Sequence, residues 1–155
     1  MESPELLRRY PFFSRFSEKQ LKAIAEISDE IDLSKGEKIF EECQPANFLF
    51  LLIEGGVDLS YKSAEEFYPK TRKDFDVGEI SPGEILAFSS LIEPYALNAT
   101  AHASQPSKFI KVDAVALRKL FENDPHMGYI AMQQLTKAIM ERLADTRVQL
   151  AAAWA

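Results

Sequence analysis

The first quarter of the chain carries hydrophobic residues at helical spacing, separated by charged and polar ones. Two helix starts precede them: Ser3 with Pro4, and Ser17 with Gln20 three residues later, which has the form of a capping box. The pattern therefore predicts a helical lead-in over residues 4–27. Three aromatic residues between the two starts are expected to pack the lead-in against the rest of the chain: Phe12, Phe13 and Phe16.

From Ser28 onward the hydrophobic period becomes that of strands. Phe48–Ile53 is apolar throughout, which predicts a strand buried on both faces, and Glu54-Gly55-Gly56 predicts the hairpin after it. Residues 62–73 are polar and predict a surface loop. Other strands are expected over residues 28–33, near Ile39, and over 57–61, 74–80, 97–103 and 108–112. Short strands separated by Gly and Pro turns predict an antiparallel roll of jelly-roll topology over residues 28–112.

The last quarter returns to a helical pattern. Asp113 is placed to cap a short helix and Asp124-Pro125 to begin a long one, so helices are expected over residues 113–151. Apolar residues of the long helix fall three or four apart: Met127, Ile130, Ala131, Leu135, Ala138, Ile139 and Leu143. We therefore expect residues 1–155 to form one α+β domain.

Composition narrows the possible functions. The chain has 24 acidic against 18 basic residues, a net charge of −6, which argues against binding nucleic acid through a general positive field. No apolar stretch approaches the roughly 20 residues of a membrane span, and no signal peptide begins the chain, so we expect a cytoplasmic protein. One cysteine, Cys43, and two histidines, His102 and His126, leave little material for a metal centre. We expect no cofactor, no metal and no enzymatic activity.

Three segments carry a more specific signal: RYPFFSRFSEKQLKAIAEI, LSKGEKIFEECQPANFLFLLIEGGVDL and SPGEILAFSSLIEPYALNATAHA. In this order they resemble the entry helix, the first strands and the phosphate-binding cassette of the cyclic nucleotide-binding domain superfamily, which includes the sensor half of Crp/Fnr-type regulators. The resemblance implies an eight-stranded, cupin-like roll with a short cassette helix and a long C-terminal helix. Cys43 stands where the family usually has glycine.

In that family a cassette glutamate binds the ribose, and an arginine nine or ten residues later neutralises the cyclic phosphate. Aligning Pro82-Gly83-Glu84 with the family pattern places Phe88 on the glutamate and Leu97 on the arginine. A phosphate buried beside leucine would lack a charge partner, so ordinary binding of cyclic AMP or cyclic GMP is not expected. The resemblance places the degenerate ligand site at Leu86, Ala87, Phe88, Ser89, Ser90, Leu97, Asn98 and Ala99.

Two interpretations of this site remain open. Phe88 and Leu97 either fill the former pocket as core, or line a pocket retuned for a more apolar effector. The first makes the chain a non-enzymatic regulatory module that acts by dimerisation or through a protein partner. The second makes it a small-molecule receptor that binds a cyclic nucleotide or another effector in an altered mode.

The long helix supports a further expectation. Its apolar stripe is wider than a helix needs to cover the roll on one side. Family members dimerise through this helix, so we expect a homodimer through Met132, Leu135, Ile139 and Leu143, with packing entirely on its own domain as the alternative. In Crp/Fnr-type regulators a helix-turn-helix domain follows; the chain stops at Ala155, so we expect no DNA binding by this chain.

Overall fold

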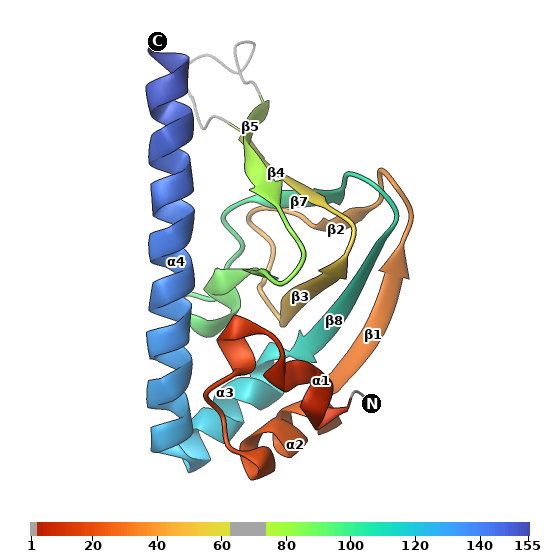
Figure 1. Cartoon of the computed structure of the whole chain (residues 1–155), viewed down its shortest axis with the longest axis vertical. Helices are drawn as coiled ribbons and strands as arrows, with labels where there is room; N and C mark the ends of the chain where they lie inside the picture. The colour runs from red at the N-terminus through yellow and green to blue at the C-terminus, as the bar shows by residue number, and fades with distance from the viewer. Residues whose placement is uncertain (1–2, 63–73) are drawn as a thin grey trace.

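The computed structural model describes residues 3–62 and 74–155 and shows a β-roll with helices along one side (Figure 1). The elements in chain order are α1 (Pro4–Arg8), η1 (Pro11–Phe13), α2 (Glu18–Glu26), β1 (Ser28–Leu33), β2 (Lys38–Phe40), β3 (Phe48–Glu54), β4 (Val57–Lys62), β5 (Asp74–Ile80), β6 (Ile85–Leu86), η3 (Phe88–Leu91), β7 (Thr100–Ala103), β8 (Ser107–Asp113), α3 (Ala114–Asn123) and α4 (Pro125–Ala153). The α+β class is confirmed.

The strands of the described residues form two antiparallel sheets of four, with the orders β1-β8-β3-β6 and β2-β7-β4-β5. This is the predicted eight-stranded roll, and the β3–β4 hairpin is where the sequence placed it. Gly55 has a φ of +104°, and a Cβ there would lie 2.6 Å from the Pro106 carbonyl oxygen, so the turn requires glycine. The predicted loop over 62–73 lies outside the described residues, apart from Lys62, which ends β4.

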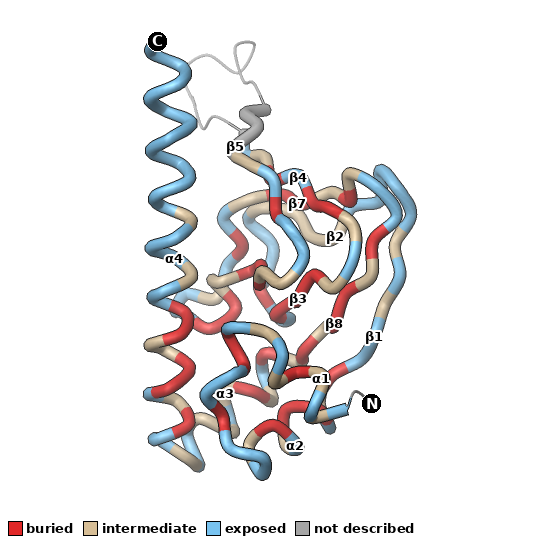
Figure 2. The backbone as a smooth tube through the Cα atoms, in the orientation of Figure 1, coloured by how far each residue is buried: buried red, intermediate tan, exposed pale blue. Residues whose placement is uncertain are grey.

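Two apolar cores lie on opposite faces of the β1-β8-β3-β6 sheet. Side chains of β3 alternate between them: Leu49 and Leu51 face the helices, whereas Phe50 and Leu52 face the roll interior. The strand is therefore buried on both faces, as its sequence predicts. All three lead-in phenylalanines, Phe12, Phe13 and Phe16, lie in the helical core. Figure 2 shows the buried residues of the helices and of β3 in red.

The helix starts follow the predicted capping residues in three cases out of four. Ser17 and Gln20 form the expected capping box, and the carboxylates of Asp113 and Asp124 accept the backbone N–H groups of Ala116 and Met127. Ser3 occupies the N-cap position of α1, but its side chain makes no capping hydrogen bond. Asp124 also accepts from the Gln20 side chain at 3.0 Å, which ties α2 to α4; this bond and that from the Met127 N–H lower the pKa of its carboxyl.

Two strand predictions need correction. The strand expected over 97–103 is only Thr100–Ala103, because Leu97 bonds instead to the 43–44 turn: its N–H donates to the Gln44 carbonyl and its carbonyl accepts from the Cys43 N–H. Ile85–Leu86 forms a short strand, β6, that the periodicity does not predict, since two residues are too few to show a period.

The long helix α4 runs beyond the roll. Its first half packs on the lead-in and α3, whereas its second half is exposed (Figures 1 and 2). None of the helices in residues 3–62 and 74–155 combines the length and the apolar character needed to cross a membrane.

The backbone conformation at Cys43 explains why the family usually has glycine at this position. The φ of Cys43 is +71°, in the left-handed region, which is unfavourable for residues with a side chain. Cys43 is also exposed to solvent. It is thus an exposed loop residue.

We predict that Cys43→Gly raises the free energy of unfolding by about 0.5–1 kcal/mol, because relief of the left-handed strain exceeds the entropy cost of glycine. Urea denaturation measures the change. Cys43→Ala is the control: it removes the thiol and keeps the strain, so an equal gain from alanine would contradict the explanation.

Candidate functional site

The cassette is a short strand followed by a tight turn. In β6, Leu86 pairs with Phe50 and Ile85 with Leu51, which fixes the start of the cassette to β3 at the edge of the β1-β8-β3-β6 sheet. Ala87 then takes a left-handed conformation, with φ 68° and ψ 49°, and turns the chain into the 3-10 helix η3. The cassette helix that the resemblance implies is therefore a single 3-10 turn of four residues.

Leu97 lies in the roll core. Its side chain is 7% exposed and belongs to the cluster that contains Phe50, Leu86 and Ala87. Its backbone is held by the two hydrogen bonds to the 43–44 turn, at 2.7 and 2.9 Å. Leu97, which the sequence alignment places at the position of the family's arginine, is thus held by its backbone and packed on several apolar neighbours.

Phe88 behaves differently. It is half-buried and packs against the helical core rather than the roll core, and its ring lies 5.2 Å from the guanidinium carbon of Arg142 on α4. That distance is within the range of a cation–π contact. Phe88 thus connects the cassette to the last helix.

A small cavity marks the place where the sequence predicts a ligand. Its volume is about 50 Å³. At about 30 Å³ per water molecule, it has room for one or two waters, against several hundred Å³ for a typical ligand site. Six of the eight predicted site residues line it, together with Arg142 and others: Leu86, Ala87, Phe88, Leu97, Asn98 and Ala99. The structure brings these six residues together.

The two remaining predicted residues do not line this cavity. Ser89 and Ser90 lie in η3, and their hydroxyl oxygens are buried without a hydrogen-bond partner among the described residues. The loop that carries them is held by Arg118 of α3, which donates to the Ser90 carbonyl at 3.0 Å and stacks 3.7 Å above the Tyr95 ring. Arg118 therefore joins α3 to the cassette.

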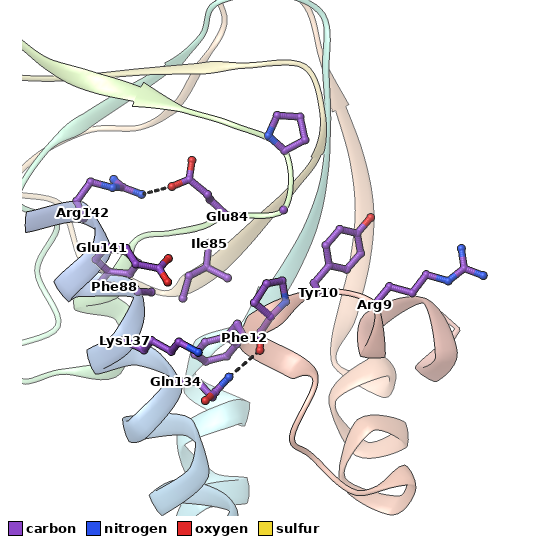
Figure 3. Close-up of a pocket in the computed structure, with 14 residues that line it drawn as sticks. Arg9, Tyr10, Phe12, Glu84, Ile85, Phe88, Gln134, Lys137, Glu141 and Arg142 are labelled. Atoms are coloured by element: carbon purple, nitrogen blue, oxygen red, sulfur yellow. Dashed lines mark hydrogen bonds and ion pairs between the residues drawn. The ribbon is translucent and has the colours of Figure 1, made fainter. Parts of the chain in front are cut away.

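Arg142 is the site residue that the sequence reasoning missed. Its side chain is 20% exposed and forms an ion pair with Glu84 at 3.8 Å, while Phe88 covers it from the cassette (Figure 3). Burial lowers the pKa of its guanidinium and the carboxylates of Glu84 and Asp145 oppose this, but an arginine stays protonated at neutral pH. Helical spacing contained the signal, because Arg142 follows Ala138 and Gln134 at intervals of four on the face toward the roll.

A larger groove lies next to the cassette (Figure 3). Its volume is about 480 Å³, and it runs between the Arg9–Phe12 segment, the Pro82–Ile85 turn and α4 from Gln134 to Arg142. At one place the Gln134 side chain donates to the Pro11 carbonyl at 2.7 Å, and at another Arg142 meets Glu84. Helix α4 thus contacts both the lead-in and the roll across this groove.

The residues predicted to form a dimer do not share one face of α4. Leu135 is 2% exposed and belongs to the helical core of its own domain, so its inclusion in an intermolecular surface is corrected. Met132 is half-buried, and Ile139 and Leu143 are 41% and 47% exposed. The sequence pattern of apolar residues three or four apart combined two different faces of α4. A helix turns about 100° per residue, so neither a step of three nor a step of four returns to the same side of the helix.

An outer apolar face remains on α4 once the core residues are removed. Tyr129 and Met140 belong to this outer face, since they are 61% and 64% exposed. Neither is among the dimer residues predicted from the sequence. Tyr129, Thr136, Leu143 and Leu150 are spaced by seven, and Met132 and Ile139 follow the first two of these by three. This spacing has the form of an a/d heptad pattern, with Thr136 as its polar member.

A two-sheet roll covered by a helical lead-in and a long final helix, with a cassette turned toward that helix, is the fold of the cyclic nucleotide-binding domains of Crp/Fnr-like proteins. The sequence model of the cyclic nucleotide-binding domain matches residues 30–124. The chain therefore belongs to the cyclic nucleotide-binding domain family.

Solved structures agree with this assignment. A protein from Geobacter metallireducens, described as a candidate cyclic nucleotide-binding protein, is 37% identical and superposes with a TM-score of 0.81 over 92% of this chain and 99% of its own. A cyclic nucleotide-binding domain from Methylobacillus flagellatus shares the fold, with a TM-score of 0.77 at 18% identity over 96% of this chain and 80% of its own.

A curated relative is a CRP-like cAMP-activated global transcriptional regulator of Mycobacterium tuberculosis, 22% identical over 147 residues and 95% of this chain. The chain spans 61% of the length of that relative.

We predict that Leu97→Ala lowers the free energy of unfolding by about 2–4 kcal/mol, the usual cost of truncating a packed leucine. Asn98→Ala, at the exposed neighbouring position, is the control and should change it by less than about 0.5 kcal/mol. Chemical denaturation of both variants measures the difference. A loss below about 1 kcal/mol for Leu97→Ala would mean that the leucine borders open space rather than core.

Proposed function

We propose that this chain is a non-enzymatic, signal-sensing regulatory domain whose cassette no longer takes a cyclic nucleotide in the family's usual way. The observation that carries the proposal is the packing of Leu97 in the roll core beside a cavity of about 50 Å³, since the sequence alignment assigns this residue to the position of the phosphate-binding arginine. A cyclic nucleotide would have to displace core side chains and leave its phosphate beside a leucine. Both requirements oppose binding, since an unpaired buried charge is costly.

The buried face of α4 supports the sensing part of the proposal. A signal-sensing domain needs an element whose position a ligand or partner can change, and α4 contacts the cassette through Phe88 and Glu84. One relative is by name a cAMP-activated transcriptional regulator, and we propose that this chain too has a regulatory output, which passes through α4.

We further propose that α4 transmits its state by pairing with a second copy of the chain. The outer face with the seven-residue spacing supports this, because a two-fold axis places the same residues of both copies against one another. The described residues leave much of this face exposed: Met140 is 64% and Leu150 is 59% exposed. A protein partner that offers an apolar helix is the alternative occupant.

Calorimetric titration with cyclic AMP and cyclic GMP tests the closed cassette. We expect no saturable heat up to about 1 mM ligand, since the loss of a charge-assisted hydrogen bond alone removes roughly ten- to a hundredfold in affinity. A thermal melt confirms that the sample is folded. A dissociation constant in the micromolar range for either nucleotide would refute the proposal.

Sedimentation equilibrium tests the pairing of α4. We expect the wild-type chain to be a dimer at about 100 µM, and Leu143→Lys to weaken the dimer at least about tenfold by placing a charge in the apolar contact. Ala144→Lys is the matched control, because it adds the same charge one residue away on an exposed flank of the same helix. A monomeric wild type, or equal effects of the two lysines, would contradict the dimer.

A further inference from the structure

The groove beside the cassette is the right size for a ligand, unlike the cavity inside the roll. Its 480 Å³ lies within the range of about 300–1,000 Å³ that small-molecule sites occupy, whereas the roll cavity is roughly a tenth of that volume. The groove lies outside the roll, between α4 and the lead-in (Figure 3). The larger of these two spaces beside the cassette is therefore on its outer side.

The charges that border the groove favour an anion. Three cationic side chains line it, Arg9, Lys137 and Arg142, against the two carboxylates Glu84 and Glu141. One oxygen of Glu84 already accepts the Ser81 backbone N–H at 2.6 Å, and the other pairs with Arg142. The whole chain has a net charge of −6, whereas the charged side chains that line the groove are positive in sum.

Arg142 keeps donor capacity for a ligand. At 3.8 Å its contact with Glu84 is an ion pair without a direct hydrogen bond, and its contact with Phe88 is with a ring face. A guanidinium has five N–H donors in a planar fork that suits a carboxylate or phosphate. Lys137, exposed on the preceding turn of α4, extends toward the Pro11–Phe12 segment in Figure 3.

The other residues that line the groove favour an aromatic ring in the ligand. The aromatic residues Tyr10, Phe12 and Phe88 line the groove, as do Ile85 and Ala138. An anion with an aromatic ring would place its charge between Lys137 and Arg142 and its ring against these side chains. A few placed polar groups among apolar walls is the usual composition of a small-molecule site.

We propose that this groove is the effector site of the domain and that its ligand is a small aromatic organic anion. The inference rests on the proposed function, because it supplies the effector that a closed cassette lacks. A bound anion competes with Glu84 for Arg142 and contacts the lead-in, the Pro82–Ile85 turn and α4 together. The anion therefore favours a position of α4 in which Arg142 is separated from Glu84 over the position with this ion pair formed. A ligand that binds two positions of a helix unequally shifts the helix toward the one it prefers.

Nuclear magnetic resonance titration of the intact ¹⁵N-labelled chain tests the proposal with three probes: 1-naphthoate, indole-3-acetate and phenyl phosphate. We expect at least one anion to give saturable shifts at the amides of residues 9–12, 83–85 and 134–142. The neutral analogue 1-naphthalenemethanol should bind at least about tenfold more weakly than 1-naphthoate, since it lacks the charge.

Variants locate the binding. Lys137→Gln, at an exposed position that folding does not need, should weaken anion binding about tenfold, and Arg142→Gln should do the same or more. Lys119→Gln, exposed on α3 away from the groove lining, should leave it unchanged. The proposal is overturned if none of the three anions saturates by about 5 mM, if the shifts fall outside the groove, or if Lys137→Gln binds as the wild type does.

A parallel titration with cyclic AMP separates the two proposals. Saturable shifts at the amides of residues 86–99 would refute the closed cassette. Failure of the aryl anions with no response to cyclic AMP would refute the groove as the effector site and leave the closed cassette standing.

Discussion

The structure depends on a sheet that is apolar on both faces. β3 alternates Leu49 and Leu51 toward the helices with Phe50 and Leu52 toward the roll, and β8 does the same with Ile110 and Phe109. A sheet of this kind exposes a large apolar surface to water unless another layer covers its outer face, at a cost of about 25 cal/mol per Å². The lead-in, α3 and the first half of α4 supply that layer.

This constraint also decides how the cassette communicates with the helices. β6 pairs with β3, so the cassette begins at the strand on which both cores depend. From there one residue of the cassette region, Leu97, packs inward and another, Phe88, packs outward against the helical core. Arg118 and Arg142 then hold the cassette from α3 and α4. The cassette is thus a connector between the two cores as well as the wall of a cavity.

Much of the fold follows from local signals in the sequence. The capping box at Ser17, the double-faced apolar run of β3 and the Gly55 hairpin each depend on residues close together in the chain, and each was predictable. The aligned cassette was predictable too, since six of its eight residues line one cavity. Helical spacing could have placed Arg142 on the inner face of α4, but its pairing with Glu84 and the groove arise from contacts between elements about 50 residues apart or more, which no local pattern reveals. Leu135 and Leu143 likewise look alike in a periodic pattern, and only packing separates the core face of α4 from the outer one.

The exposed half of α4 makes the helix a lever. The Gln134–Pro11 hydrogen bond holds the helix about a third of the way along its length, and at 1.5 Å per residue its last residue lies about 28 Å further along the axis. A tilt of about 10° at that fulcrum displaces the far end by about 5 Å, close to one helical turn. The pair between Arg142 and Glu84 lies about 12 Å along this arm, about two fifths of its length, so a tilt that moves this pair moves the tip a little more than twice as far.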